Sequence, residues 1–179
     1  MRHAIGFAIA LAVGFGVTDG ITAAPTASYE KQAVQDAQTS DDVVLEWNEI
    51  AVVTIGTQPP FPSTRSMATV QLAVFEAVNA ISGKYEWYLG TITAPDGAST
   101  QAAAITAAHG VLKAFFPAAA ITLDQQRVDS LALIQDGQAK TDGIAVGEAT
   151  ARAVLAARSK DNFYNTATYS NPAANPGVW

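Results

Sequence analysis

The apolar stretch from about Ser63 to Ile81 constrains the fold of this chain more than any other feature. Large apolar residues recur there at steps of three and four, the spacing of one face of an α-helix. They are Met67, Val70, Val74, Val78 and Ile81. Leu72, Phe75 and four alanines extend the apolar surface around most of the helix. A helix of this kind is covered by its neighbours, so the stretch predicts the buried central helix of an all-α bundle.

Local signals mark both ends of this predicted helix, about residues 63–81. Prolines at 59, 60 and 62 disfavour helix before it, and Ser63 suits the N-cap position. Gly83 suits the left-handed position after a helix end. Glu76 and Asn79 are polar and three residues apart. They read as a hydrogen-bonded pair that holds a neighbouring helix or loop, or alternatively as the wall of a site.

Residues 1–24 have the pattern of a secretory signal peptide. A short basic start precedes an apolar run from Ile5 to Val17, and small residues follow at positions 21–24. The run is shorter than the roughly 20 residues that a membrane span needs. We therefore expect cleavage between Ala23 and Ala27, no membrane span in the mature chain, and a secreted or periplasmic bacterial protein.

Composition narrows the partners and the chemistry. The net charge of -6 argues against nucleic acid and anionic membranes as partners. The chain has no Cys, which excludes disulfides and thiol chemistry. The roughly 155 residues after the signal are enough for one hydrophobic core. We expect a disordered leader at 25–40, a helical domain of about five helices at 41–160, and an irregular tail at 161–179.

The helical domain is predicted to open at Asp41-Asp42, because acidic residues favour a helix N-terminus. Frequent β-branched residues leave strand as an alternative for the second half of this first helix. The polar interruption at residues 47–49 breaks strand alternation and favours helix.

Three helices are predicted after the central one, beyond an aromatic linker at 84–89 and a turn at 94–97. The first runs from Thr100 to Phe116, capped by Ser99 and ended by Pro117. The next begins at Thr122 or Asp124 and closes at Asp136-Gly137, and the last spans about 139–159. Gly143 and Gly147, four residues apart in this last helix, allow a partner helix to approach closely.

The sequence shows no recognisable catalytic motif. It has no Gly-rich phosphate loop and no Gly-x-Ser-x-Gly elbow. His109 is the one histidine after the signal, and its place in an Ala-rich helix favours a packing or surface role over a ligand or catalytic one. Scattered aspartates (Asp129, Asp136 and Asp142) read as solvated helix ends, and Arg127, Arg152, Arg158 and Lys160 form no evident anion pocket. We predict no catalytic, cofactor-binding or metal-binding residue in this chain.

Several segments, in order, carry a resemblance to a known family. They are Val43–Ala51, Arg65–Ala68 with Phe75–Ile81, Tyr85–Leu89, Ala107–Leu112 with Phe116-Pro117, Gly143–Gly147, and Asn175–Trp179. Their order and spacing resemble the N-terminal helical half of bacterial vanadium-dependent haloperoxidase-like proteins, relatives of the type 2 phosphatidic-acid phosphatases. No single segment is specific, but the ordered set covers nearly the whole mature chain.

The resemblance implies an all-helical fold and, in complete members, a vanadate or phosphate pocket in the C-terminal half. That pocket uses a Lys, two Arg, a Ser-Gly-His segment and a second His. This chain has no Ser-Gly-His segment, so the fold and family are carried over and no catalytic residue is.

The expected function is therefore that of an N-terminal scaffold part of a secreted protein. The complete protein would oxidise halides with peroxide, as a haloperoxidase, or hydrolyse phosphate esters, as an acid phosphatase. This chain alone is predicted to be inactive and without a cofactor. Its expected partner is a C-terminal catalytic half or a second copy of itself. The alternative is a free-standing secreted helical protein with a binding or structural role.

Overall fold

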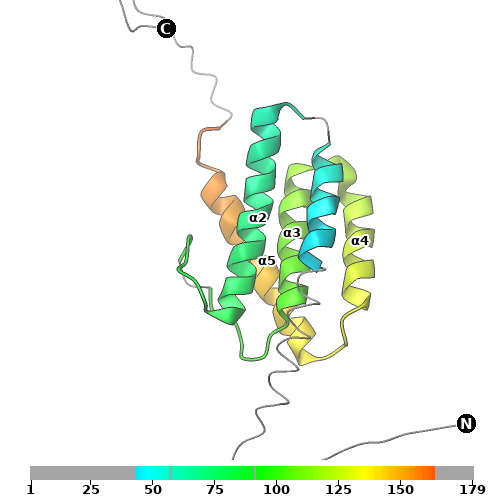
Figure 1. Cartoon of the computed structure of the whole chain (residues 1–179), viewed down its shortest axis with the longest axis vertical. Helices are drawn as coiled ribbons and strands as arrows, with labels where there is room; N and C mark the ends of the chain where they lie inside the picture. Colours follow the sequence, from blue (N-terminus) through cyan, green and yellow to red (C-terminus); the bar gives the residue numbers. More distant parts are fainter. Residues whose placement is uncertain (1–42, 57, 91, 164–179) are drawn as a thin grey trace, which may run out of the picture.

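The computed structural model describes residues 43–56, 58–90 and 92–163. These ranges are 75% helical and contain no strand. The helices are residues 43–55, α2 (Pro60–Ser82), α3 (Thr100–Phe115), α4 (Ala120–Ala132) and α5 (Gln138–Arg158), and a short 3-10 turn, η1 (Pro117–Ala119), precedes α4. Successive helices from α2 to α5 alternate in direction, which makes an antiparallel bundle (Figure 1). The predicted all-α bundle of about five helices is confirmed.

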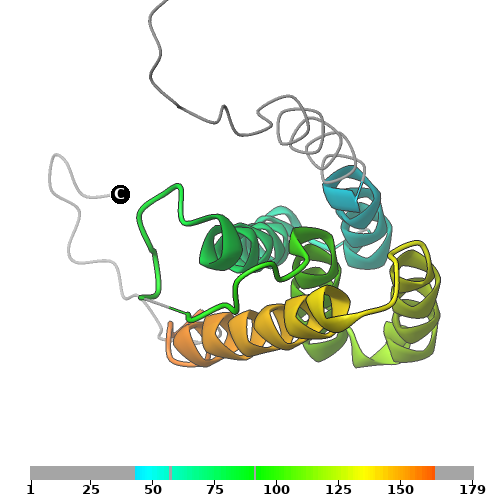
Figure 2. The same cartoon turned by 90° about the horizontal axis from the view of Figure 1, so that it is seen from below.

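The centre of the bundle is α3, which corrects the prediction for residues 63–81. Ten of the 16 residues of α3 are buried, against eight of 23 in α2. α3 packs on α2, α4 and α5, and it lies between them when the bundle is seen from below (Figure 2). Its many alanines allow neighbours to approach from every side. The larger side chains of α2 are less enclosed, and Phe75 is 39% exposed.

The start of α2 also differs from the prediction. The helix begins at Pro60, with Pro59 in the N-cap position, so Ser63 is not the cap. Prolines fit the first turn because the backbone N–H groups there have no helical partner. The Ser63 hydroxyl instead donates to the Pro60 carbonyl oxygen at 2.9 Å. The predicted stop is confirmed, since Gly83 has φ 60° and its N–H donates to the Asn79 carbonyl oxygen at 2.8 Å.

The remaining helices lie close to their predicted positions. The Ser99 hydroxyl caps α3 by accepting from the Ala102 N–H at 3.2 Å. The helix at 43–55 is continuous, so the strand alternative for its second half is wrong. α4 starts before Thr122 and ends at Ala132, four residues before Asp136. Asp136 pairs with Lys140 instead, in the first turn of α5.

α3 and α5 pack through small residues, as the Gly143 and Gly147 spacing predicts. A Cβ atom on Gly147 would collide with the Thr106 hydroxyl and with the Ala103 carbonyl oxygen. A Cβ on Gly143 would lie 3.0 Å from the Ala102 Cβ and collide with the Ser99 backbone. The helices can adopt this separation only because both positions are glycine.

The predicted signal peptide (1–24), the leader (25–40), the Asp41-Asp42 helix start and tail residues 164–179 lie outside the described residues. Among the residues described, no single helix is both long and apolar enough to cross a membrane. Within this part of the chain, the length and composition expected of a membrane span are met only by two helical segments taken together. These are Thr100–Phe115 and Pro117–Ala132, which meet at 119°.

Candidate functional site

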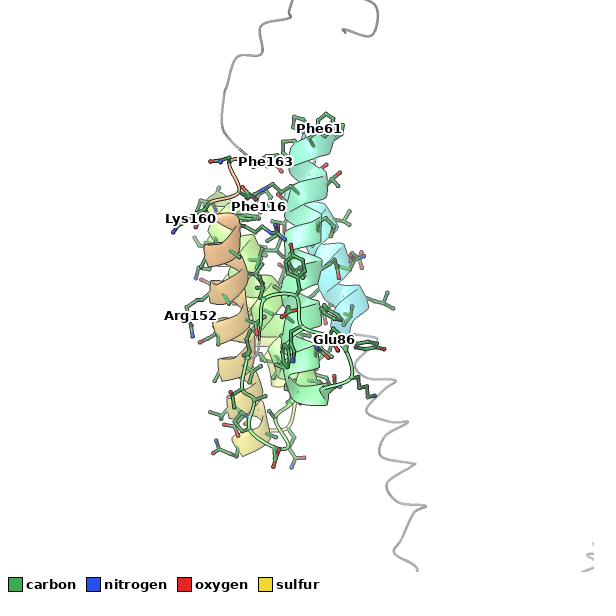
Figure 3. The ribbon with its side chains drawn as sticks, turned by 90° about the vertical axis from the view of Figure 1, so that its left-hand side faces the viewer. Phe61, Glu86, Phe116, Arg152, Lys160 and Phe163 are labelled. Atoms are coloured by element: carbon green, nitrogen blue, oxygen red, sulfur yellow. The ribbon has the colours of Figure 1, made fainter. Side chains whose placement is uncertain are left out.

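A hollow lined by two arginines lies where α2 begins and α5 ends. Its volume is about 660 Å³. Figure 3 shows Phe163 and Phe61 at this end of the molecule, with Lys160 turned outward. The lining comes from α2, α3, α5 and the segment after α5: Arg65, Ala114, Phe115, Leu155, Arg158, Ser159, Asp161, Asn162 and Phe163. We call this the Arg65 site.

Arg65 joins the parts of this site. Its Nε and Nη2 atoms donate to Asp161 Oδ2 at 3.2 and 3.0 Å. Its Nη2 also donates to the Arg158 carbonyl oxygen at 3.3 Å, at the last residue of α5. The guanidinium carbon lies 5.3 Å from the Phe115 ring centroid and 4.7 Å from that of Phe163. Arg65 therefore fastens the end of α5 to the start of α2 and the end of α3.

The second arginine of the site is Arg158, which binds the loop before α3. Its Nη2 donates to the Tyr88 hydroxyl at 2.8 Å, and its guanidinium carbon lies 5.4 Å from the Tyr88 ring centroid. Asp161 pairs with Arg65 and also lies within the electrostatic influence of Arg158. The Phe163 backbone N–H and the Arg65 guanidinium hold the pKa of the Asp161 carboxyl below its ordinary value.

The Arg65 site does not fit a vanadate or phosphate ion. Such an ion needs several cationic donors directed at it, whereas two guanidinium nitrogens of Arg65 bond the Asp161 carboxylate. That carboxylate lines the same hollow and would repel an oxyanion. His109 lies on α3 six residues before Phe115, about 9 Å along the helix axis. The contacts described so far indicate that the Arg65 site holds the ends of neighbouring helices together.

Glu76 and Asn79 form a second polar cluster, inside the bundle. Glu76 is 0% and Asn79 1% exposed. The Asn79 amide bonds both backbone groups of Tyr85, donating at 2.8 Å and accepting at 2.9 Å. Glu76 Oε1 accepts from the Tyr88 N–H at 2.8 Å. The pair thus holds the loop between α2 and α3, which favours the first of the two sequence interpretations. Glu76 Oε2 has no hydrogen-bond partner in the described part of the chain.

His109 belongs to a third cluster, between α3 and α4. Its Nε2 lies 2.8 Å from Asp124 Oδ1, and Lys113 Nζ donates to both Asp124 oxygens at 2.7 and 2.8 Å. Desolvation lowers the pKa of His109, the hydrogen bond to the Asp124 carboxylate opposes this shift, and the charge of Arg127 adds to it. The bonds from Lys113 and His109 lower the pKa of Asp124.

The helix at 43–55 joins this region through Trp47. The Trp47 ring meets His109 edge to face, with centroids 6.2 Å apart. Its Nε1 donates to Ser130 Oγ at 3.2 Å, and Ser130 donates to Glu46 Oε1 at 2.8 Å. The two bonds and the ring contact join the helix at 43–55, α4 and α3 around the indole. They support the packing role predicted for His109, since each described contact of the ring is to a neighbouring helix or its own.

The structure brings together residues that the sequence interpretation left apart. Arg158 was considered unclustered, and it lies with Arg65 at one site. A signal for Arg65 did exist: it is the one basic residue of α2, a helix otherwise rich in apolar side chains. Its acidic partner, Asp161, is 96 positions away, and no sequence pattern links it to Arg65. Arg127 pairs with Glu148 of α5 at 2.7 Å, while Asp129 and Asp142 bond glutamines of their own helices.

Exposed apolar side chains form the other feature of functional interest. On α4, Ile121 is 87% and Val128 60% exposed, and they lie two helical turns apart on one face. Leu133, the residue that follows α4, is 86% exposed and lies roughly 120–140° around the helix axis from the other two. We call these three residues the α4 stripe. Leu45 and Val53 of the first described helix are also open, at 66% and 74%.

The three polar clusters are each engaged in contacts between helices and loops, and the open apolar side chains lie on other surfaces. Within residues 43–56, 58–90 and 92–163, no group of three or more His, Cys, Asp and Glu residues could hold a metal ion. Comparison of the chain with models of known protein families, with curated proteins and with solved structures gave no significant match.

Proposed function

We propose that this chain is the helical scaffold part of a secreted haloperoxidase-like or acid-phosphatase-like protein, and that it is inactive without a catalytic part. The observation that carries the proposal is the α4 stripe. Apolar patches exposed on a surface mark sites of contact with another protein surface, and Ile121 and Val128 expose large apolar side chains on one face of α4. The described polar clusters serve packing, which accords with a supporting role. The resemblance noted in the sequence supplies the identity of the partner, a C-terminal catalytic half.

The first test is an activity measurement on the purified chain with vanadate, peroxide and bromide. We expect no bromination of a phenol dye and no hydrolysis of p-nitrophenyl phosphate above the buffer rate. Donors that stabilise a transition state are each worth orders of magnitude in rate, and the Arg65 site turns its donors to Asp161. Activity of the chain alone that is lost in His109→Ala would overturn the proposal.

The second test adds the protein encoded by the DNA that follows the codon of Trp179. We expect binding, and activity only in the mixture. Ile121→Ser should weaken binding about tenfold, because a buried Ile side chain contributes ~1.5–3 kcal/mol. Thr122→Ser, at the adjacent exposed position, is the matched control and should leave binding unchanged. Equal affinity of the Ile121→Ser variant and the wild type would show that the α4 stripe is not the contact.

A further inference from the structure

A groove runs between the helix at 43–55 and α2, on a different surface from the α4 stripe. It has two hollows. The larger, about 500 Å³, is lined by Val52, Ile55, Gly56, Ser63, Thr64, Met67 and Ala68. The smaller, about 260 Å³, is lined mainly by α2 residues from Gln71 to Ser82, with Val44 and Tyr85. The α2 residues of both hollows recur at steps of three and four, so the hollows lie along one face of the helix.

The groove is uncharged and open. None of its lining residues is acidic or basic, in a chain whose net charge is -6. Val52 is 55%, Phe75 39% and Tyr85 66% exposed along it. Gln71, which lines the smaller hollow, donates from Nε2 to Asn48 Oδ1 at 2.8 Å and so joins the two helices. A segment that binds here must offer apolar side chains without bringing charge into the hollows.

The chain itself contains such a segment in residues 164–179. These sixteen residues include no Asp, Glu, Lys, Arg or His, and they carry Tyr164, Tyr169 and Trp179. Aromatic side chains bury large apolar areas and keep a polar atom for hydrogen bonding. The composition of the segment therefore complements that of the groove.

The last described residue before this segment, Phe163, lies at the same end of α2 as the larger hollow. Phe163 lies with its ring centroid 4.7 Å from the Arg65 guanidinium carbon. Arg65 adjoins Thr64 and lies one helical turn from Ala68, and both of these line the larger hollow. Sixteen extended residues reach roughly 50 Å. The α2 part of the groove, from Thr64 to Ser82, is about 27 Å long, so the segment can span it.

We propose that residues 164–179 dock in this groove within the same molecule, with aromatic side chains in the two hollows. Docking in the same molecule is favoured over docking between molecules because a tethered segment has an effective concentration near the millimolar range. The proposal does not depend on the proposed function, which concerns the α4 stripe.

Spin-label distances in the full chain test this docking. The chain has no cysteine, so Gln58→Cys and Ser170→Cys introduce two specific label positions. We expect one narrow distance distribution in the doubly labelled chain and no such distance in a mixture of the two singly labelled chains. A broad distribution in the doubly labelled chain would overturn docking. The same narrow distance in the mixture would show that the segment docks between copies and would also overturn the proposal.

Two groove variants and a matched control connect the distance to the groove. Val52→Asp puts a charge on the groove wall, and Ala68→Trp fills the larger hollow without adding charge. Val53→Asp is the control, since Val53 is an exposed valine on the same helix, at 74% against 55%, and lines neither hollow. We expect both groove variants to broaden the distribution and to speed chymotryptic cleavage after Tyr169 about tenfold. The control should do neither, and an equal effect of Val53→Asp would refute the assignment of the groove.

Discussion

Single residues in this bundle join segments that are far apart in the sequence. Arg65 contacts Asp161 and the Arg158 carbonyl oxygen, 96 and 93 positions away, and packs between two phenylalanine rings. Planar geometry and several donors allow one guanidinium to make all these contacts at once. Lysine has the same charge and lacks that geometry, so the role of Arg65 depends on its shape.

Replacing Arg65 by lysine should therefore destabilise the fold. The shorter ammonium side chain could keep one ion pair with Asp161, but it would lose the paired donors and the stacking on Phe115 and Phe163. We expect a loss of about 1 kcal/mol from the cation–π contacts alone, measured as a lower urea midpoint. Arg152→Lys is the control, because Arg152 projects outward from α5 (Figure 3). Equal midpoints for the Arg65→Lys variant and the wild type would contradict the fastening role of Arg65.

His109 should make the stability of the fold depend on pH. Its folded pKa lies below the ordinary 6.5, chiefly because burial disfavours the charged ring. The unfolded chain then binds a proton that the folded chain does not, as pH falls from about 6.5 toward the folded pKa. Stability should decrease over that interval. The lowered pKa of Asp124 acts at lower pH, since its ordinary value is 3.8.

The measurement is urea unfolding at pH 7.5 and pH 5.5 for the wild type and His109→Gln. The glutamine amide can still donate to Asp124 and does not titrate, so the variant should lose less stability between the two pH values. All other titrating groups, including His3, are common to both proteins. The same pH dependence in both would show that His109 is not the responsible group.

The positions of the helices along the chain follow largely from local sequence patterns. Their packing arrangement does not. Apolar spacing, the Ser99 cap and the stop at Gly83 are local signals, and each was visible in the sequence. The central position of α3 depends on which helix its neighbours can approach from all sides. Alanine content decides how closely neighbours can approach and favours α3 as the central helix. The size of the apolar side chains had favoured α2 for that position. The Arg65 site depends on Asp161, which follows α5, and no spacing rule connects residues 96 positions apart.

The contact between α3 and α5 gives a test at this scale. Gly147→Ala should be stabilising by about 1 kcal/mol if only helix propensity mattered. The added Cβ would instead collide with Thr106 and the Ala103 backbone. We expect a net destabilisation of about 1–3 kcal/mol, the usual cost of overpacking, measured by thermal or urea unfolding.

Ala145→Gly serves as the comparison for this substitution. Ala145 is exposed on the same helix, so its replacement should cost about 1 kcal/mol through propensity alone. The two results together separate packing from propensity. A Gly147→Ala variant more stable than the wild type would mean that α5 can move away from α3 without cost.

On the scale of the whole molecule, the described residues form a buried core and leave several large apolar side chains exposed on the surface. Leu45 and Val53 lie open on the first described helix, and Ile121, Val128 and Leu133 form the α4 stripe. The chain with no partner present should expose this apolar surface to water. Such surfaces promote association between molecules and bind hydrophobic dyes.

We therefore predict dye binding or self-association by the chain alone, measured by the fluorescence of an anilinonaphthalene dye and by sedimentation. Ile121→Ser combined with Val128→Ser should reduce both signals, because two of the three apolar groups of the α4 stripe are removed. Gln71→Ala, which removes the Gln71–Asn48 bond without touching α4, is the control for a general loss of stability. Salt should strengthen the association, since it screens the repulsion between chains of net charge -6. A monodisperse chain that binds no dye and unfolds in one sharp transition would count against the stripe as a contact surface. It would then favour the alternative of a helical protein complete without a catalytic partner.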